Sequence, residues 1–280
     1  MTGPLLTQAE AARYAPRPGS TGAFAWLRTL SYYPHVALAT IVLGLWGALT
    51  QLRHGRRGAQ RVATVWISYM LLAARWHMGV AVELRGTPPA DGQNALIAAK
   101  HQSFLDILAI ACAARQRGFV MKREVMRVPI MGWYAREVGS IPIDRSKGRD
   151  AMGQIVAAIH DRMGQPGGLG HLIVYPEGTR TRPGEYRPYK HGIATMHLET
   201  GLPVWPVAVN CGLFWPRRGL PVASGRAVIE FLPPMQAEPG ETRDAFIERL
   251  RTVIESRSDA LMAEAGFIAQ PGTTPDANQL

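Results

Sequence analysis

Apolar residues are concentrated in two long runs near the start of the 280-residue chain. The first run, Thr29–Leu52, contains no Asp, Glu, Lys or Arg. A helix of these 24 residues is about 36 Å long, enough to cross a hydrocarbon core of ~30 Å with tilt. Pro34 is expected in the first helical turn, where proline is tolerated. Counted from Pro34, the helix is about 28 Å long, just short of a span.

The second run, Val62–Ala74, gives about 20 Å of helix and is too short to span a bilayer. A basic cluster at Arg53–Arg61 separates the two runs and suits anionic lipid headgroups. Trp26, Tyr32 and Tyr33 lie at the start of the first run, where an interfacial aromatic belt would place them. The pattern predicts either a hairpin that dips into one leaflet or one span followed by an interfacial helix. The alternative is a pair of buried core helices in a soluble protein.

From Gly79 onward, short apolar runs alternate with segments of helical character. Strands are expected at 79–84, 95–99, 118–121, 140–143, 172–175, 204–209 and 227–232. Helices are expected at 103–115, 129–138, 150–163, 192–198 and 241–265. Strands interleaved with helices predict an α/β fold with a mostly parallel sheet flanked by helices.

These patterns divide the chain into four parts. Residues 1–22, punctuated by Pro16, Pro18 and Gly19, are expected to be an irregular lead-in. The other three parts are a membrane-associated two-helix motif at 23–77, an α/β domain at 78–268 and a disordered tail at 269–280.

The formal net charge of +10 indicates an anionic partner: nucleic acid, an acidic membrane surface or a phosphorylated substrate. Cys112 and Cys211 lie in apolar settings without CxxC spacing. Neither a disulfide framework nor a zinc site is therefore expected, and a reducing cytosolic face is favoured.

The first candidate for chemistry is the turn between the strand at 95–99 and the helix that follows it. Ser103 and Asp106 match a capping box, which places the helix start at Ser103 and Asp106 in its first turn. From there the carboxylate of Asp106 can point back at the imidazole of His101, hold one ring tautomer and make the other nitrogen a better base. The stretch alone is equally explained by a capping Asp106 and an incidental His101.

A second candidate is the turn Tyr175–Arg182, which directly follows a strand. Its glycine exposes backbone N–H groups, while Thr179 and Arg180 add a hydroxyl and a guanidinium, a combination that suits a phosphate. Glu177 either holds Arg180 or contacts a substrate hydroxyl. The alternative is a surface turn with an ordinary Glu–Arg pair.

Two more cations stand at predicted strand ends. Lys122 is a candidate anion contact or a solvated surface lysine, and Arg145 lies at the ligand-facing edge of the sheet or in a solvated loop. The chain contains no GxGxxG, no GxxxxGK[ST] and no GxSxG, so dinucleotide, P-loop and serine-nucleophile sites are unsupported.

Taken together and in this order, the motifs resemble the glycerolipid acyltransferase family, and most closely its bacterial 1-acylglycerol-3-phosphate acyltransferases. His101–Asp106 resembles the family's His-x4-Asp motif, and the segment Lys122–Arg145 its second block. Tyr175–Arg180 resembles the Phe-Pro-Glu-Gly-Thr-Arg block, with Tyr175 in place of Phe. Lys100 stands where Asn often precedes the histidine, and its role stays open.

The resemblance implies transfer of a fatty acyl group from acyl-CoA or acyl carrier protein to the sn-2 hydroxyl of 1-acylglycerol-3-phosphate, giving phosphatidate. His101 would be the general base and Asp106 would orient it. Glu177, Gly178, Thr179, Arg180 and Arg145 would hold the glycerol phosphate, with Lys122 as a further contributor. Neither a metal nor a cofactor beyond the thioester co-substrate is required.

The resemblance further implies partners and a location. The partners are a lysophospholipid acceptor, an acyl thioester donor and an anionic membrane surface; nucleic acid is not expected. The location is the inner or cytoplasmic membrane with the active site facing the cytosol. The alternatives are a family member that acylates another lysolipid, a non-enzymatic membrane-binding protein, and a lipid hydrolase, which the missing nucleophile disfavours.

Overall fold

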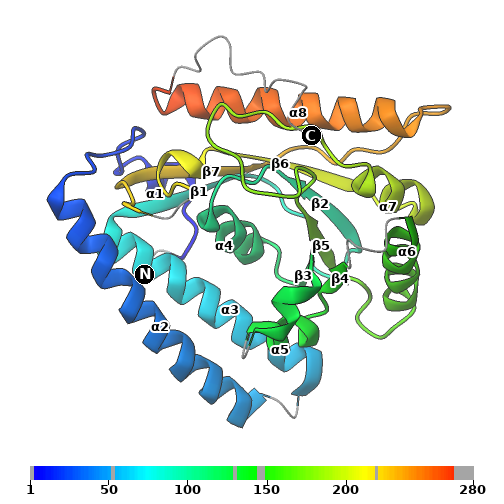
Figure 1. Cartoon of the computed structure of the whole chain (residues 1–280), viewed down its shortest axis with the longest axis horizontal. Coiled ribbons are helices and arrows are strands. Elements are labelled where there is room, and N and C mark those ends of the chain that lie inside the picture. The colour runs from blue at the N-terminus through cyan, green and yellow to red at the C-terminus, as the bar shows by residue number, and fades with distance from the viewer. Residues whose placement is uncertain (1–2, 52–53, 129–130, 144–148, 218–219, 268–280) are drawn as a thin grey trace.

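The computed structural model describes residues 3–51, 54–128, 131–143, 149–217 and 220–267. A seven-stranded sheet with the strand order β1-β7-β6-β2-β5-β3-β4 lies at its centre (Figure 1). The strands are Val80–Gly86 (β1), Ala95–Ala99 (β2), Arg117–Lys122 (β3), Ile141–Ile143 (β4), His171–Val174 (β5), Val204–Val209 (β6) and Gly225–Phe231 (β7). The mostly parallel α/β fold predicted from the sequence is confirmed.

Neighbouring strands are parallel in every pair but one, because β7 runs antiparallel to β6. β6, β2, β5, β3 and β4 therefore share a direction, and their carboxyl ends meet at one edge of the sheet. In open α/β sheets this is the edge at which ligands bind. The turns that follow β2 and β5 are consequently brought together there.

The helices cover both faces of the sheet. They are Gln8–Ala11 (α1), Ala23–Gln51 (α2), Gly55–Ala73 (α3), Phe104–Ala113 (α4), Met131–Glu137 (α5), Arg149–Met163 (α6), Gly192–Thr200 (α7) and Arg243–Glu264 (α8). Short helical segments occur at Ala74–Met78 (η2), Arg123–Arg127 (η3) and Cys211–Leu213 (η5). Side chains of β2 alternate between the two layers: Ala95, Ile97 and Ala99 pack with α3 and α4, whereas Leu96 and Ala98 pack with α6, α7 and α8.

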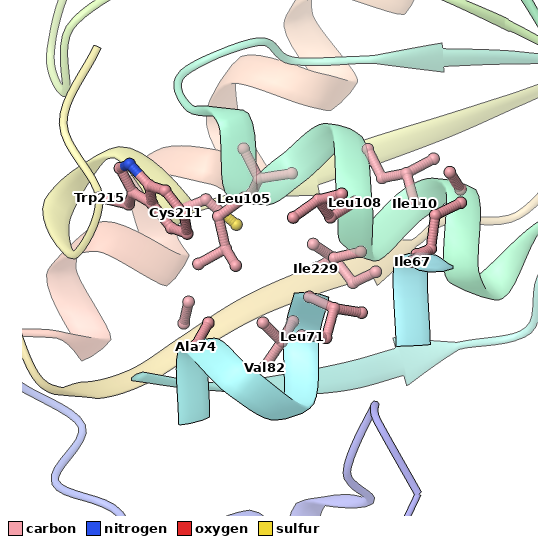
Figure 2. Packing of buried hydrophobic residues seen from close by; sticks show 14 of the residues in the cluster. Ile67, Leu71, Ala74, Val82, Leu105, Leu108, Ile110, Cys211, Trp215 and Ile229 are labelled. Atoms are coloured by element: carbon pink, nitrogen blue, oxygen red, sulfur yellow. The ribbon is translucent and has the colours of Figure 1, made fainter. Parts of the chain in front are cut away.

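The larger core lies beneath α4. Figure 2 shows its buried side chains, which come from α3 and η2 (Ile67, Leu71, Ala74), β1 and β7 (Val82, Ile229), α4 (Leu105, Leu108, Ile110) and the segment after β6 (Cys211, Trp215). Close packing against this core fixes α4, and with it the turn at the amino end of α4. Cys112 and Cys211 are both free thiols.

α2 and α3 form a helical hairpin, with α2 on the outside of α3 (Figure 1). Within the described part of the chain, α2 is the one helix long and apolar enough to cross a membrane, over Ala23–Leu49. Only 22% of its most apolar window is buried inside the protein. α2 therefore differs from the core helix of a soluble protein, which was the alternative left open by the sequence.

The start of α2 differs from the sequence-based prediction. α2 begins at Ala23, so Pro34 lies inside the helix rather than in its first turn. Tertiary packing stabilises the turns before the proline: Tyr32 is fully buried, stacks edge-on against Trp215 and donates a hydrogen bond to the Met70 carbonyl at 3.2 Å.

The lead-in is tied to the sheet. Leu6 forms a parallel bridge with Glu83 of β1 and is 1% exposed. The short helix α1 follows, with a capping box at Thr7, and Ala11 packs with Leu6. An isolated bridge and one helical turn are too short to leave a periodic pattern, so the sequence indicates only an irregular segment here.

Candidate active site

The turn after β2 carries His101, and hydrogen bonds to α4 hold it in shape. Ser103 caps α4 and its Oγ accepts from the Leu105 N–H at 3.0 Å. Asp106 Oδ2 accepts from the N–H groups of Gln102 at 2.7 Å and Ser103 at 2.6 Å. The capping box that the sequence predicts is therefore present, and it immobilises the Asp106 carboxylate.

The second oxygen of Asp106 faces the imidazole. Oδ1 lies 2.9 Å from His101 Nδ1. The Asp106 side chain is fully buried, whereas 13% of the His101 side chain is exposed. A carboxylate on Nδ1 keeps the proton on that nitrogen and leaves Nε2 free to accept one, which is the state required of a general base.

Tyr175 lines the other side of the imidazole. Its ring stacks on His101 with 4.1 Å between centroids and 25° between planes. Its hydroxyl is buried without a hydrogen-bond partner among the described residues, and burial raises the pKa of the Tyr175 hydroxyl far above its ordinary value. Tyr175 therefore acts as a neutral aromatic wall, in line with the Phe that the resemblance expects here.

The turns that follow β2 and β5 are joined through the backbone of His101. The His101 N–H donates to Glu177 Oε2 at 2.7 Å, and the His101 carbonyl accepts from the Thr181 N–H at 2.8 Å. Glu177 Oε1 accepts from Lys100 Nζ at 2.9 Å and from the Thr181 hydroxyl at 3.0 Å. These bonds hold the two turns in one fixed relative position.

Glu177 is placed differently from the expectation that it contacts the acceptor. Its side chain is fully buried, and both carboxylate oxygens are engaged by protein donors. It also pairs with Lys100 rather than with Arg180, the neighbour considered from the sequence. Lys100 lies 77 residues away, so local spacing carried no signal of this pair.

His101 lines a cavity of about 1040 Å³. Most of its wall is apolar and comes from α2 to α6, β3 and the segments after β5. Arg117, at the start of β3, is part of the lining and is 1% exposed, and burial lowers the pKa of Arg117 to about 10. The size matches an extended organic ligand, since ordinary ligand pockets have volumes of about 300–1,000 Å³.

Polar residues line the same cavity as His101. Gly178, Thr179 and Arg180 line it, and so does Lys122 at the end of β3. Arg145 lies outside the described residues. Gly178 has a φ of +70°, which favours glycine, and a Cβ at this position would lie 2.9 Å from Lys190 Cε.

Lys190 also lines the cavity, although it was not among the site residues predicted from the sequence. Its backbone N–H donates to the Pro176 carbonyl at 2.9 Å, so its chain segment packs directly on the Gly178 turn. The signal available in the sequence was the segment Lys190-His191-Gly192, which resembles what usually follows the Phe-Pro-Glu-Gly-Thr-Arg block in the family. Within the described ranges, no group of three or more His, Cys, Asp or Glu side chains is placed to hold a metal ion.

The fold and these motifs define the class of the protein. The protein-family model described as Acyltransferase matches residues 81–210, which include β1 to β6, His101, Asp106 and the Gly178–Arg180 turn. This segment of the chain, residues 81–210, is therefore assigned to the acyltransferase family.

Several similar proteins are named as one kind of acyltransferase. The chain is 29% identical to the 1-acyl-sn-glycerol-3-phosphate acyltransferase of Pseudomonas aeruginosa, over 89% of this chain and 96% of that protein. It is 28% identical to the human 1-acyl-sn-glycerol-3-phosphate acyltransferase alpha, over 72% of this chain and 74% of that protein. The crystal structure of the 1-acyl-sn-glycerophosphate acyltransferase PlsC from Thermotoga maritima has the same fold, with a TM-score of 0.67 and 22% identity over 85% of this chain and 95% of that one.

Proposed function

We propose that this protein transfers a fatty acyl group from a thioester, acyl-CoA or acyl carrier protein, to the sn-2 hydroxyl of 1-acylglycerol-3-phosphate, giving phosphatidate. The observation that carries the proposal is the His101–Asp106 contact of 2.9 Å at the wall of a large, mostly apolar cavity, beside a turn suited to phosphate. Relatives of this chain carry the same activity in their names. At 28–29% identity, these relatives support acyl transfer as the reaction more strongly than they support lysophosphatidate as the acceptor.

His101 takes the proton of the acceptor hydroxyl through Nε2 while the oxygen attacks the thioester carbonyl. An alcohol is a weak nucleophile at neutral pH, so a positioned base contributes about 10²–10⁴-fold. Asp106 stabilises the imidazolium that forms. As the C–S bond breaks, the thiolate leaves and the imidazolium can return the proton to it, so no covalent enzyme intermediate is needed.

The cavity suits the acyl chain of the donor or acceptor. Strand register places Arg117 level with His171, and His171 level with Ala95. Ala95 precedes His101 by six positions, which corresponds to about 20 Å along the sheet. A single chain in a bilayer occupies about half of the ~30 Å hydrocarbon core. A cavity lined by both His101 and Arg117 is therefore long enough for one whole fatty acyl chain.

A panel of donors and acceptors tests the proposed function. Purified protein with lysophosphatidate and acyl-CoA or acyl carrier protein is expected to form phosphatidate, measured by mass spectrometry. Higher kcat/KM for another lysolipid would reassign the acceptor. Absence of turnover with every lysolipid, together with salt-sensitive binding to liposomes, would favour a non-enzymatic membrane-binding protein, and fatty acid release without an acceptor would favour a hydrolase.

Arg180 is proposed to bind the acceptor phosphate. A hydrogen bond to a charged group contributes about 1.5–3 kcal/mol, and each 1.4 kcal/mol is about tenfold in affinity. Arg180→Ala is therefore expected to raise the KM for lysophosphatidate about 10- to 100-fold. The matched control is Arg182→Ala, since Arg182 is exposed and lies outside the cavity lining. Unchanged KM and kcat in Arg180→Ala would contradict the phosphate role.

The two N-terminal helices are proposed to dock in one leaflet rather than to cross the bilayer. Hydrogen bonds attach α2 to α3 at Tyr32 and at Thr40, which accepts from Trp66 at 2.9 Å. They also attach α2 to α5, because the Gly44 carbonyl accepts from Tyr134 at 3.2 Å. The end of the hairpin is also attached, because Arg56 donates to the Gly168 and Leu169 carbonyls at 2.6 and 2.7 Å. A helix bound in this way cannot cross a bilayer without taking the domain with it.

The outer face of α2 supplies the membrane contact. Its exposed apolar side chains recur at helical spacing: Phe24, Leu27, Leu30, Leu38, Ile41, Val42, Leu45 and Leu49. Within the basic cluster expected to bind headgroups, Arg56 donates its hydrogen bonds to backbone carbonyls of the protein. Arg57 is exposed and can contact lipid headgroups. The membrane is proposed to be the cytoplasmic one, with the site on the cytosolic side where acyl thioesters are supplied.

The triple variant Leu38→Ser/Ile41→Ser/Leu45→Ser tests the docking face. All three side chains are at least half exposed, so the fold is expected to keep its stability. Binding to vesicles that contain anionic lipid is expected to fall at least tenfold, measured by co-sedimentation. Leu198→Ser, at an exposed leucine on α7, is the control and is expected to bind normally. Normal vesicle binding by the triple variant would exclude this face.

A further inference from the structure

Lys100, the residue before His101, is the cation of a buried cluster that joins three distant parts of the chain. Its Nζ lies 2.9 Å from Glu177 Oε1 and 2.7 Å from Glu255 Oε2 of α8. Tyr189 donates its hydroxyl to Glu255 Oε1 at 2.9 Å. Lys100, Glu177 and Glu255 are 1%, 4% and 5% exposed. Burial opposes the charge on Lys100, but the two carboxylates outweigh it and raise the pKa of Lys100, which therefore stays protonated.

Such a cluster is a costly way to stabilise a fold. Removing three charges from water carries a large desolvation penalty, and apolar side chains of similar volume often stabilise a protein as well or better. Buried ionic groups are better explained where they fix one geometry. Here the geometry lies next to the catalytic candidate, because Glu177 Oε2, the oxygen that does not bind Lys100, accepts the His101 N–H at 2.7 Å.

We infer that Lys100 and Glu255 are positioning residues, which orient Glu177 so that the His101 turn and the Gly178–Arg180 turn keep a fixed separation. The inference rests on the proposed function, in which His101 holds the base and the second turn holds the acceptor phosphate. Glu177 thus contributes as the link between the turns. Glu255 lies outside the residues 81–210 matched by the family model, so α8 completes the site from beyond the matched domain.

The direction of the expected effect follows from geometry. If Lys100 and Glu255 only stabilised the protein, changing them would lower the melting temperature and leave kcat of the folded fraction unchanged. If they set the distance between the base and the acceptor hydroxyl, changing them lowers kcat, whereas the phosphate contacts remain and KM is unchanged. A misplacement of about 1 Å can cost on the order of 10²-fold in rate.

Glu255→Gln is the first test, because it removes one charge while keeping the side-chain shape and an oxygen for Tyr189. We expect kcat to fall by about 10- to 100-fold, with the acceptor KM within about twofold of wild type. The matched control is Glu230→Gln, which breaks another ion pair of α8, the 2.7 Å contact between Glu230 and Arg257. The control is expected to keep wild-type kcat even where its melting temperature falls equally.

A double variant guards against misfolding. Lys100→Met/Glu255→Met replaces one ion pair of the cluster by apolar side chains. Burial already raises the pKa of Glu177, so without Lys100 its carboxyl group is expected to take up a proton rather than stay buried as an unpaired charge. The variant is therefore expected to fold but to show the same loss of kcat. Wild-type kcat in either variant, or a raised KM with unchanged kcat, would overturn the inference while leaving the proposed function intact.

A spectroscopic measurement separates failure of the inference from failure of the proposed function. The His101 amide proton is bonded to the Glu177 carboxylate, so its NMR resonance is expected to move upfield in Glu255→Gln and to stay in place in Glu230→Gln. Lack of turnover by wild-type protein with every acceptor would overturn the proposed function, whereas an unmoved His101 resonance would overturn the coupling itself.

Discussion

His101→Ala is expected to lower kcat for phosphatidate formation by about 10²–10⁴-fold, because the variant removes the base while leaving the thioester and acceptor sites in place. The fold is expected to persist. The hydrogen bonds that organise this turn use the backbone N–H and carbonyl of residue 101, and alanine retains both. The measurement is steady-state transfer from acyl-CoA to lysophosphatidate, with circular dichroism to check folding.

A second His–Asp contact in the protein provides a matched control. His191 Nδ1 lies 3.2 Å from Asp244 Oδ1, but both side chains are largely exposed and neither lines the cavity. His191→Ala is expected to keep wild-type kcat. Turnover by His101→Ala within about twofold of wild type would contradict the assignment of His101 as the base.

Asp106→Asn is expected to reduce kcat by up to about 10⁴-fold, the size of the effect when a carboxylate-to-amide change beside a catalytic histidine selects the wrong tautomer. Two backbone N–H groups, of Gln102 and Ser103, need an acceptor where Asp106 Oδ2 now lies. The single oxygen of the introduced amide is required there, so the NH₂ group of that amide faces His101 Nδ1. The imidazole then carries its proton on Nε2 and cannot accept one from the alcohol.

This prediction distinguishes orientation of the base from general stability. Since the amide oxygen preserves the cap of α4, the melting temperature of Asp106→Asn is expected to fall only slightly. Asp244→Asn is the surface control. ¹⁵N NMR of the imidazole reports the tautomer directly, and a proton still on Nδ1 in Asp106→Asn, with normal kcat, would contradict the role of Asp106.

Secondary structure was largely readable from local patterns. The strands β2 and β6 coincide with the apolar runs at 95–99 and 204–209, because strands buried on both faces are continuous apolar segments. α4 was readable through its cap, since Ser103 and Asp106 satisfy backbone donors within three residues of each other. Pro34 shows the limit of such reasoning: burial of Tyr32 against Trp215 supports helix before a proline that locally favours a helix start.

The candidate site, like the secondary structure, was readable from the sequence where it depends on neighbouring residues. Local spacing determines that His101 precedes a capped helix, that Asp106 can reach back to it, and that a glycine turn with Thr179 and Arg180 follows a strand. These features depend on interactions within a few residues, which a sequence displays directly. The order of the motifs also carries the resemblance to acyltransferases, which the family match and the shared fold confirm.

Only the tertiary structure decided what lies between the motifs. The parallel sheet brings the turns after β2 and β5 to one edge, and their contacts bury Glu177 on His101 and Lys100. Lys100 could not be assigned from the sequence because its partner Glu255 lies 155 residues away. Burial and distance between remote segments are set by how whole helices and strands pack, and a pattern of neighbouring residues does not contain them.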